Sequence, residues 1–236
     1  MCSSDLLTGR RVILRLRPAA LRLRWARVRR ILALGASGFA MSMTNSLVQV
    51  LCNASLQVYG GDLYVGVMTV INSVREVVSM PVQGITNGCQ PVLGYNYGAG
   101  EYGRVRKLYN LVLIMSGAIM AAGTVICLLF PAQLMGLFTE TPETIEAGKT
   151  ALRIISAGFL VSAVSVTSCG ALEGLGKGAA SLIISLARYV VVILPAAFLL
   201  SRLFGAAGVW NAFWVTEVIS AAVSLAVYRR ATAHRA

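Results

Sequence analysis

Six long apolar stretches constrain this chain more than any other feature of its sequence. A helix needs about 20 predominantly apolar residues to cross the hydrocarbon core of a bilayer. The stretches that meet this length are residues 31–58, 63–95, 108–130, 151–172, 179–201 and 206–228. Only 13% of the residues are charged, whereas soluble domains carry about 25%. We therefore predict an all-α polytopic membrane protein with six transmembrane helices in residues 31–228.

The net charge of +12 is concentrated at the N-terminus. Residues 1–30 hold nine arginines and a single acid, Asp5. No basic stripe interleaved with aromatic residues runs through the rest of the chain, so nucleic acid is not an expected partner. Residues 1–30 are interpreted either as a basic cytoplasmic segment beside the lipid surface or as a non-native N-terminus. The second interpretation is favoured because the arginines spread around most of a helical wheel.

The charges of the predicted loops indicate an orientation. Six spans place both termini on one side of the membrane, together with residues 98–107 and 173–177. Without residues 1–30, the loops and tail on that side sum to +5 and those on the other side to −2. Cytoplasmic loops carry an excess of Lys and Arg. We therefore predict that both termini, including a tail at residues 229–236, are cytoplasmic.

The sequence offers no catalytic or metal-binding pattern. Its five cysteines are isolated, and four lie in apolar stretches, as expected of small packing side chains. The one histidine, His234, lies in the polar tail. No phosphate-binding Gly-x₄-Gly-Lys-Ser/Thr loop occurs, so ATP is not the expected energy source. We predict that the chain is not an enzyme and needs no cofactor.

One stretch is distinctive: MPVQGITNGCQPVLGYNYGAG at residues 80–100, followed by Arg104, Arg106 and Lys107. It resembles the eighth helix and the following cytoplasmic loop of the MATE (multidrug and toxic compound extrusion) family. The Gly60-Gly61-Asp62 turn and the segment from Gly205 to Trp210 are also similar to family patterns. One departure is Trp214, where many relatives have proline.

This resemblance implies a function. The chain would be the C-terminal six-helix lobe of a twelve-helix secondary antiporter, and its partner would be a missing N-terminal lobe. Such a transporter exports bulky, often cationic drugs across the bacterial plasma membrane in exchange for Na⁺ or H⁺. Some family members bind sodium through acids in their seventh and tenth helices, but the corresponding spans here, 31–58 and 151–172, contain none.

Polar side chains inside the first span point to a cavity. Asn45, Gln49, Asn53 and Gln57 recur every four residues and so follow one slowly drifting helix face. Polar residues in a membrane span usually face a cavity or a neighbouring helix. Interhelical hydrogen bonding, worth about 0.6 kcal/mol on average, is the alternative. Four amides on one face favour a substrate cavity.

The second span carries a similar face. Gln83, Asn87 and Gln90 are further cavity candidates, and Glu76 lies seven residues before Gln83. Glu76 is a candidate carrier of the coupling cation or proton. The alternative, which we favour slightly, is an ion pair with an arginine on another helix, such as Arg188 in the fifth span.

Two more features complete the prediction. Glu217, the single acid of the last span, is expected to pair with Arg188 or Arg75, or to bind cations. Pro195 is expected to distort the fifth span because it lacks a backbone donor.

Two other functions compete with efflux. A lipid-linked oligosaccharide flippase has the same broad fold, but its cavity would need more cationic residues than Arg75 and Arg188. A non-transporting fragment is the other alternative, because the chain lacks half of the helices of the family.

Overall fold

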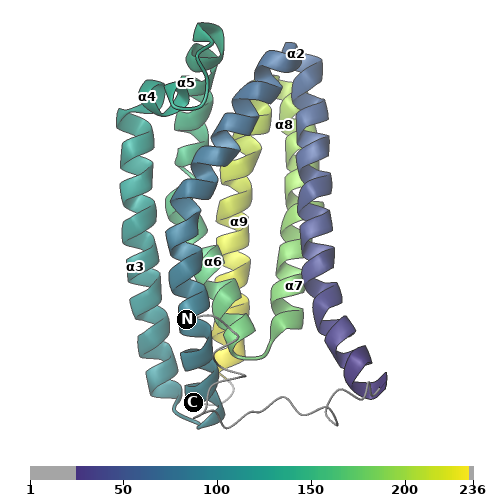
Figure 1. Cartoon of the computed structure of the whole chain (residues 1–236), viewed down its shortest axis with the longest axis vertical. Coiled ribbons are helices and arrows are strands. Elements are labelled where there is room, and N and C mark those ends of the chain that lie inside the picture. Colours follow the sequence, from purple (N-terminus) through teal and green to yellow (C-terminus); the bar gives the residue numbers. More distant parts are fainter. Residues whose placement is uncertain (1–24, 234–236) are drawn as a thin grey trace, which may run out of the picture. The chain divides into compact units, whose positions relative to one another are not determined.

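The computed structural model describes residues 25–233, and all the regular structure among them is helical. The helices are α2 (Trp25–Gly98), α3 (Tyr102–Leu129), α4 (Pro131–Gly136), α5 (Pro142–Ser156), α6 (Phe159–Gly174), α7 (Gly178–Leu186), the π-helix η2 (Ala187–Ile193), α8 (Leu194–Phe204) and α9 (Ala206–Ala233) (Figure 1). The predicted all-α class is confirmed. Most of the arginine-rich residues 1–30, and residues 234–236, lie outside the described part.

Contacts divide the chain into two units, residues 1–40 and residues 41–236. The described part of the first unit, residues 25–40, is helical and forms the start of α2. The second unit contains every feature discussed below.

The chain reverses direction inside α2, near Gly61 (Figure 1). Gly61 has a φ of +59°, which glycine adopts without the steric cost that a Cβ imposes. Beside this turn, the Gln57 amide donates a hydrogen bond to the Asp62 carboxylate, at 3.4 Å. The reversal falls between the first two predicted spans. Residues 41–60 and residues 61–98 are called here the first and second arms of α2.

Among the described residues, four helical segments are long and apolar enough to cross a membrane: Gly61–Gly98, Tyr102–Leu129, Gly178–Phe204 and Ala207–Thr232. They agree with the second, third, fifth and sixth predicted spans. The 38-residue second arm is about 57 Å long at 1.5 Å per residue, well beyond a hydrocarbon core of about 30 Å. This arm is therefore longer than one straight crossing of the membrane requires.

The fourth span differs from its predicted form. Residues 151–172 were expected to form one helix, but α5 and α6 meet at an angle of 51°, a geometry found both in broken spans and in re-entrant loops. The break lies at Ala157 and Gly158. A Cβ on Gly158 would lie 3.1 Å from Trp214 Cα, so α9 packs closely against the bend. The span also begins earlier than predicted, because Pro142 occupies the first turn of α5, where its missing donor is harmless.

Pro195 acts on the fifth span through a change of helix type. It lies in the first turn of α8, immediately after the seven-residue π-helix η2. Proline cannot donate the usual backbone hydrogen bond to the residue four positions before it. The residue four positions before Pro195 lies in the π-helix η2. π-Helices are rare and are often found at functional sites.

Glycines let α2 and α6 approach closely. A Cβ on Gly94 would lie 2.7 Å from the Gly174 carbonyl oxygen, and one on Gly170 would lie 2.1 Å from the Thr86 methyl group. Small residues commonly form such contacts between membrane helices. By contrast, large apolar side chains of α3, among them Leu111, Ile114 and Leu129, are exposed. Apolar groups at these positions suit contact with lipid.

Candidate functional site

A polar hollow lies between α2, η2, the first half of α6 and the middle of α9. It consists of two adjoining recesses that share Asn45, Arg75, Arg188 and Tyr189. The larger recess has a volume of about 310 Å³. We call the two together the central hollow; its other lining residues are Val48, Gln49, Cys52, Asn53, Met68, Asn72, Glu76, Ser79, Phe159, Ser162, Val166, Ile193, Phe213, Gln83 and Glu217.

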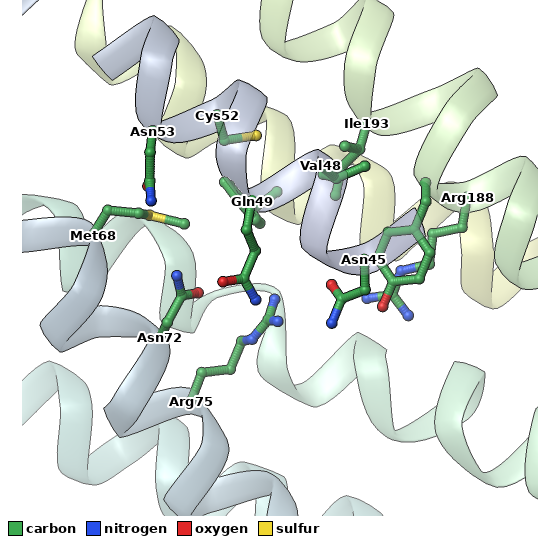
Figure 2. A pocket seen from close by; sticks show the side chains of 12 residues that line it. Asn45, Val48, Gln49, Cys52, Asn53, Met68, Asn72, Arg75, Arg188 and Ile193 are labelled. Atoms are coloured by element: carbon green, nitrogen blue, oxygen red, sulfur yellow. The ribbon is translucent and has the colours of Figure 1, made fainter. Parts of the chain in front are cut away.

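The first arm of α2 contributes the amides that its four-residue spacing predicted. Asn45, Gln49 and Asn53 all line the hollow, whereas Gln57, the fourth residue of the series, bonds to Asp62 instead. Figure 2 shows Gln49 extending from this arm toward Asn72 and Arg75 of the second arm. The amide groups present both donors and acceptors. This part of the hollow can therefore hydrogen-bond to neutral polar groups or to water.

The second arm contributes a more highly charged wall. Arg75, Glu76, Ser79 and Gln83 line the larger recess. Arg75 also lines the smaller recess, together with Asn72. The predicted candidates Glu76 and Gln83 thus lie in the same hollow as the amides of the first arm.

Asn87 and Gln90 lie outside the central hollow, although they continue the polar series of the second arm. Asn87 is exposed. The Gln90 amide donates to Glu173 at the end of α6, at 3.1 Å, and the other oxygen of Glu173 accepts from Ser181 of α7, at 2.9 Å. Through the Glu173 carboxylate, these two hydrogen bonds join α2, α6 and α7. The close contacts at Gly94 and Gly170 bring α6 against this part of α2.

Arg188 of η2 and Glu217 of α9 form an ion pair in the wall of the hollow. Both side chains are largely buried, with 18% and 9% of their surfaces exposed. Arg188 Nε and the second Glu217 oxygen have no hydrogen-bond partner among the described residues. One of the predicted partners of Glu217 is thus confirmed, and the pair retains an unused donor and an unused acceptor.

Glu76 does not form the predicted ion pair with Arg188. Arg188 pairs with Glu217 instead, and Glu76 is exposed on the hollow's wall. Within the described residues neither Glu76 nor Arg75 takes part in an ion pair. The hollow therefore contains two arginines and two glutamates, of which one pair is joined and the other two charges are available to a ligand.

Sequence reasoning did not single out several lining residues. Tyr189, Phe159 and Phe213 give the hollow aromatic walls. Tyr189 follows Arg188 directly in the sequence. In an apolar span, however, the sequence pattern does not distinguish an aromatic residue that lines a cavity from one that packs against another helix. Ser162 lies just after the bend between α5 and α6, which the sequence did not reveal.

Comparison with known proteins shows which family and which proteins this chain is similar to. The family model described as MatE matches residues 38–199. The multidrug export protein MepA of Staphylococcus aureus strain N315 is 23% identical over 199 residues, which cover 84% of this chain and 44% of that protein. A MepA protein of Staphylococcus saprophyticus matches to the same extent. The chain therefore spans about half the length of the curated relatives it matches.

Solved structures agree on the fold. An outward-facing multidrug resistance MATE family transporter superposes with a TM-score of 0.88 at 20% identity, over 98% of this chain and 52% of that one. An inward-facing structure of such a transporter gives 0.84 at 20% identity, over 98% and 53%. A MOP superfamily transporter from Pyrococcus furiosus gives 0.88 at 19% identity, over 98% and 52%. Each comparison shows a likeness of fold to one half of a larger protein.

Proposed function

Because the chain belongs to the MATE family, we propose that it is the C-terminal lobe of a secondary active multidrug efflux antiporter. The lobe would export bulky, often cationic xenobiotics in exchange for Na⁺ or H⁺. The MatE match over residues 38–199 and the relatives named as multidrug export proteins support this proposal.

The observation that carries the proposal is the central hollow. It combines amides, aromatic rings and two charges without a partner among the described residues. Binding sites for varied small molecules are commonly apolar recesses with a few placed polar groups. Because the charges of the hollow cancel, affinity for cationic drugs would depend mainly on the aromatic walls.

The exposed surface of the second arm supports a missing partner lobe. Glu76, Gln83 and Asn87 are exposed on this arm, and a Cβ on Gly84 or Gly88 would meet nothing within 4 Å. A face in contact with hydrocarbon would not carry a carboxylate and two amides, because polar groups there are costly. A second six-helix lobe that covers this face would enclose the hollow.

The comparisons suggest how such a lobe would work. It superposes almost equally well on outward- and inward-facing transporters, with TM-scores of 0.88 and 0.84. This similarity is what is expected if the lobe moves largely as one body and opens the hollow to each side in turn. In this proposal both termini lie in the cytoplasm and the helices span the bacterial plasma membrane, as the positive-inside rule indicates.

The charge balance of the hollow weighs against a flippase for lipid-linked pyrophosphates. Such a substrate would need an excess of cationic side chains. Arg188 is already paired with Glu217, which leaves Arg75 beside the acidic Glu76.

Efflux of a fluorescent cationic dye tests the proposal. The chain would be expressed alone and together with an N-terminal lobe taken from a full-length relative, in cells that lack their own exporters. We expect dye export only from the combined lobes, because the isolated lobe leaves one wall of the hollow open. Export by the chain alone as a monomer, or no export by correctly assembled lobes, would contradict the proposal.

A further inference from the structure

A separate recess lies where α3 begins and α9 ends. It has a volume of about 440 Å³, and its polar wall is formed by Arg106, Asn110 and Arg229. Its apolar wall is formed by Leu113, Val164 and Leu225. None of these residues lines the central hollow, so the α3–α9 recess is a second, independent feature of the lobe.

The polar wall of the recess is positively charged. Arg106 and Arg229 are both exposed, and neither forms an ion pair with a described residue. The acid that starts this end of α3, Glu101, lies near Arg104, at 3.9 Å, and does not line the recess. Two guanidinium groups and an amide therefore present donors without a compensating carboxylate.

Tyr228 provides an independent indication that the recess can bind a ligand. It lines the recess but is only 5% exposed, and its hydroxyl has no hydrogen-bond partner among the described residues. Its ring stacks on Tyr109, at 3.9 Å between centroids. The Tyr109 hydroxyl, by contrast, is bonded to Ser168 at 2.8 Å. Buried polar groups are normally satisfied, so the Tyr228 hydroxyl is available to an acceptor that enters the recess.

The polar and apolar walls are separated along the helices. Leu113 is seven residues beyond Arg106 in α3, about 10 Å further from the helix start at 1.5 Å per residue. Leu225 likewise precedes Arg229 by one turn of α9. Both helices belong to candidate membrane spans. The recess therefore passes from a cationic rim to an apolar interior, in the direction from membrane surface to membrane core.

We propose that the α3–α9 recess binds an anionic phospholipid. The headgroup phosphate would accept hydrogen bonds from Arg106 and Arg229, in the charge-assisted geometry that guanidinium groups favour. The Tyr228 hydroxyl would donate to a lipid oxygen, and one acyl chain would lie against Leu113, Val164 and Leu225. The proposal requires only that the lobe is embedded in a bilayer and does not depend on drug export.

Native mass spectrometry of the whole chain, purified in mild detergent, tests this. The protein would be offered equal amounts of phosphatidylglycerol and phosphatidylcholine with identical acyl chains. We expect phosphatidylglycerol to be retained preferentially, and the Arg106→Gln/Arg229→Gln variant to lose about tenfold of that preference. The matched control is Arg104→Gln/Arg230→Gln, which removes the same charge from the same end without touching the recess. It should keep the preference.

Several other results of this experiment would contradict the proposal. Equal losses in both double variants would show that only net charge attracts the lipid, and no loss in Arg106→Gln/Arg229→Gln would remove the recess from binding. Displacement of phosphatidylglycerol by an excess of inorganic phosphate would overturn a lipid as the occupant. If the double variant aggregates, Tyr228→Phe decides the matter, since it keeps the ring stack and all charges. Reduced phosphatidylglycerol retention by Tyr228→Phe supports the site, and unchanged retention overturns it.

Discussion

Arg188 and Glu217, which are 29 positions apart in the sequence, form a largely buried ion pair that joins the π-helix η2 to α9. The pair lies on the wall of the central hollow. Each partner offsets a charge that would otherwise be costly in a membrane.

Removal of one partner should therefore destabilise the protein. We expect Arg188→Met to lower the thermal stability and yield of the folded chain, with a cost of about 3–5 kcal/mol for the buried carboxylate left behind. Adding Glu217→Gln should restore part of the loss. Fluorescence-detected gel filtration after heating measures both effects. Arg202→Met is the control, because Arg202 is exposed in α8 and outside the described ion pairs; an equal loss there would show that the pair is not the cause.

Glu76 should affect ion coupling more than folding. It is exposed in the hollow and outside the described ion pairs, so Glu76→Gln should leave the fold and drug binding intact in a reconstituted two-lobe transporter. If Glu76 carries the coupling ion, efflux by this variant should no longer depend on pH or Na⁺. Transport assays in liposomes with imposed gradients measure this. Glu101→Gln, in the loop before α3, should retain the dependence, and an unchanged dependence in Glu76→Gln would exclude Glu76 from coupling.

Two glutamines on the first arm allow a matched test of drug binding. Gln49 lines the hollow, whereas Gln57, two steps further along the same four-residue series, bonds to Asp62 at the turn. We expect Gln49→Leu to change drug affinity in the two-lobe transporter by roughly five- to tenfold, as loss of one or two hydrogen bonds implies. Gln57→Leu should change it little. Fluorescence titration with a dye substrate measures both, and equal effects would contradict the assignment of the hollow.

The orientation of the chain can be tested by cysteine labelling. In a background without native cysteines, Thr141→Cys should react with a membrane-impermeant maleimide added outside the cell, and Tyr102→Cys should react only after the membrane is opened. The reason is the excess of Lys and Arg in the loop of Tyr102 over that of Thr141. The reverse labelling pattern would invert the predicted topology.

The contact between α2 and α6 should tolerate no side chain at Gly94. A Cβ there would lie 2.7 Å from the backbone oxygen of Gly174, so Gly94→Ala should destabilise the chain by about 1–3 kcal/mol through overpacking. Gly84, on the same arm, has open space where a Cβ would lie. Gly84→Ala should be neutral or slightly stabilising, because alanine favours the helix. Thermal denaturation of both variants measures the difference, and equal stabilities would contradict the close contact.

Helix periodicity accounts for the part of the site that the sequence predicted. Asn45, Gln49 and Asn53 line the same hollow because residues four positions apart share a helix face. The same reasoning grouped Gln83 with Gln90, and there it was incomplete. Gln83 lines the hollow, but Gln90 bonds to Glu173, since a shared face can meet different neighbours along its length.

The sequence by itself determined the class of the protein, because repeated apolar stretches of membrane-spanning length leave helices as the expected structure. Its Gly60-Gly61-Asp62 pattern also marked a turn between the first two spans, and the missing backbone donor of Pro195 predicted a distortion of the fifth span. Only the tertiary structure decided that Arg188 pairs with Glu217 and leaves Glu76 to the hollow. It also decided that α5 and α6 bend where α9 packs against Gly158. Partner choice and bending depend on which helices lie next to one another, and periodicity within a single helix carries no information about its neighbours.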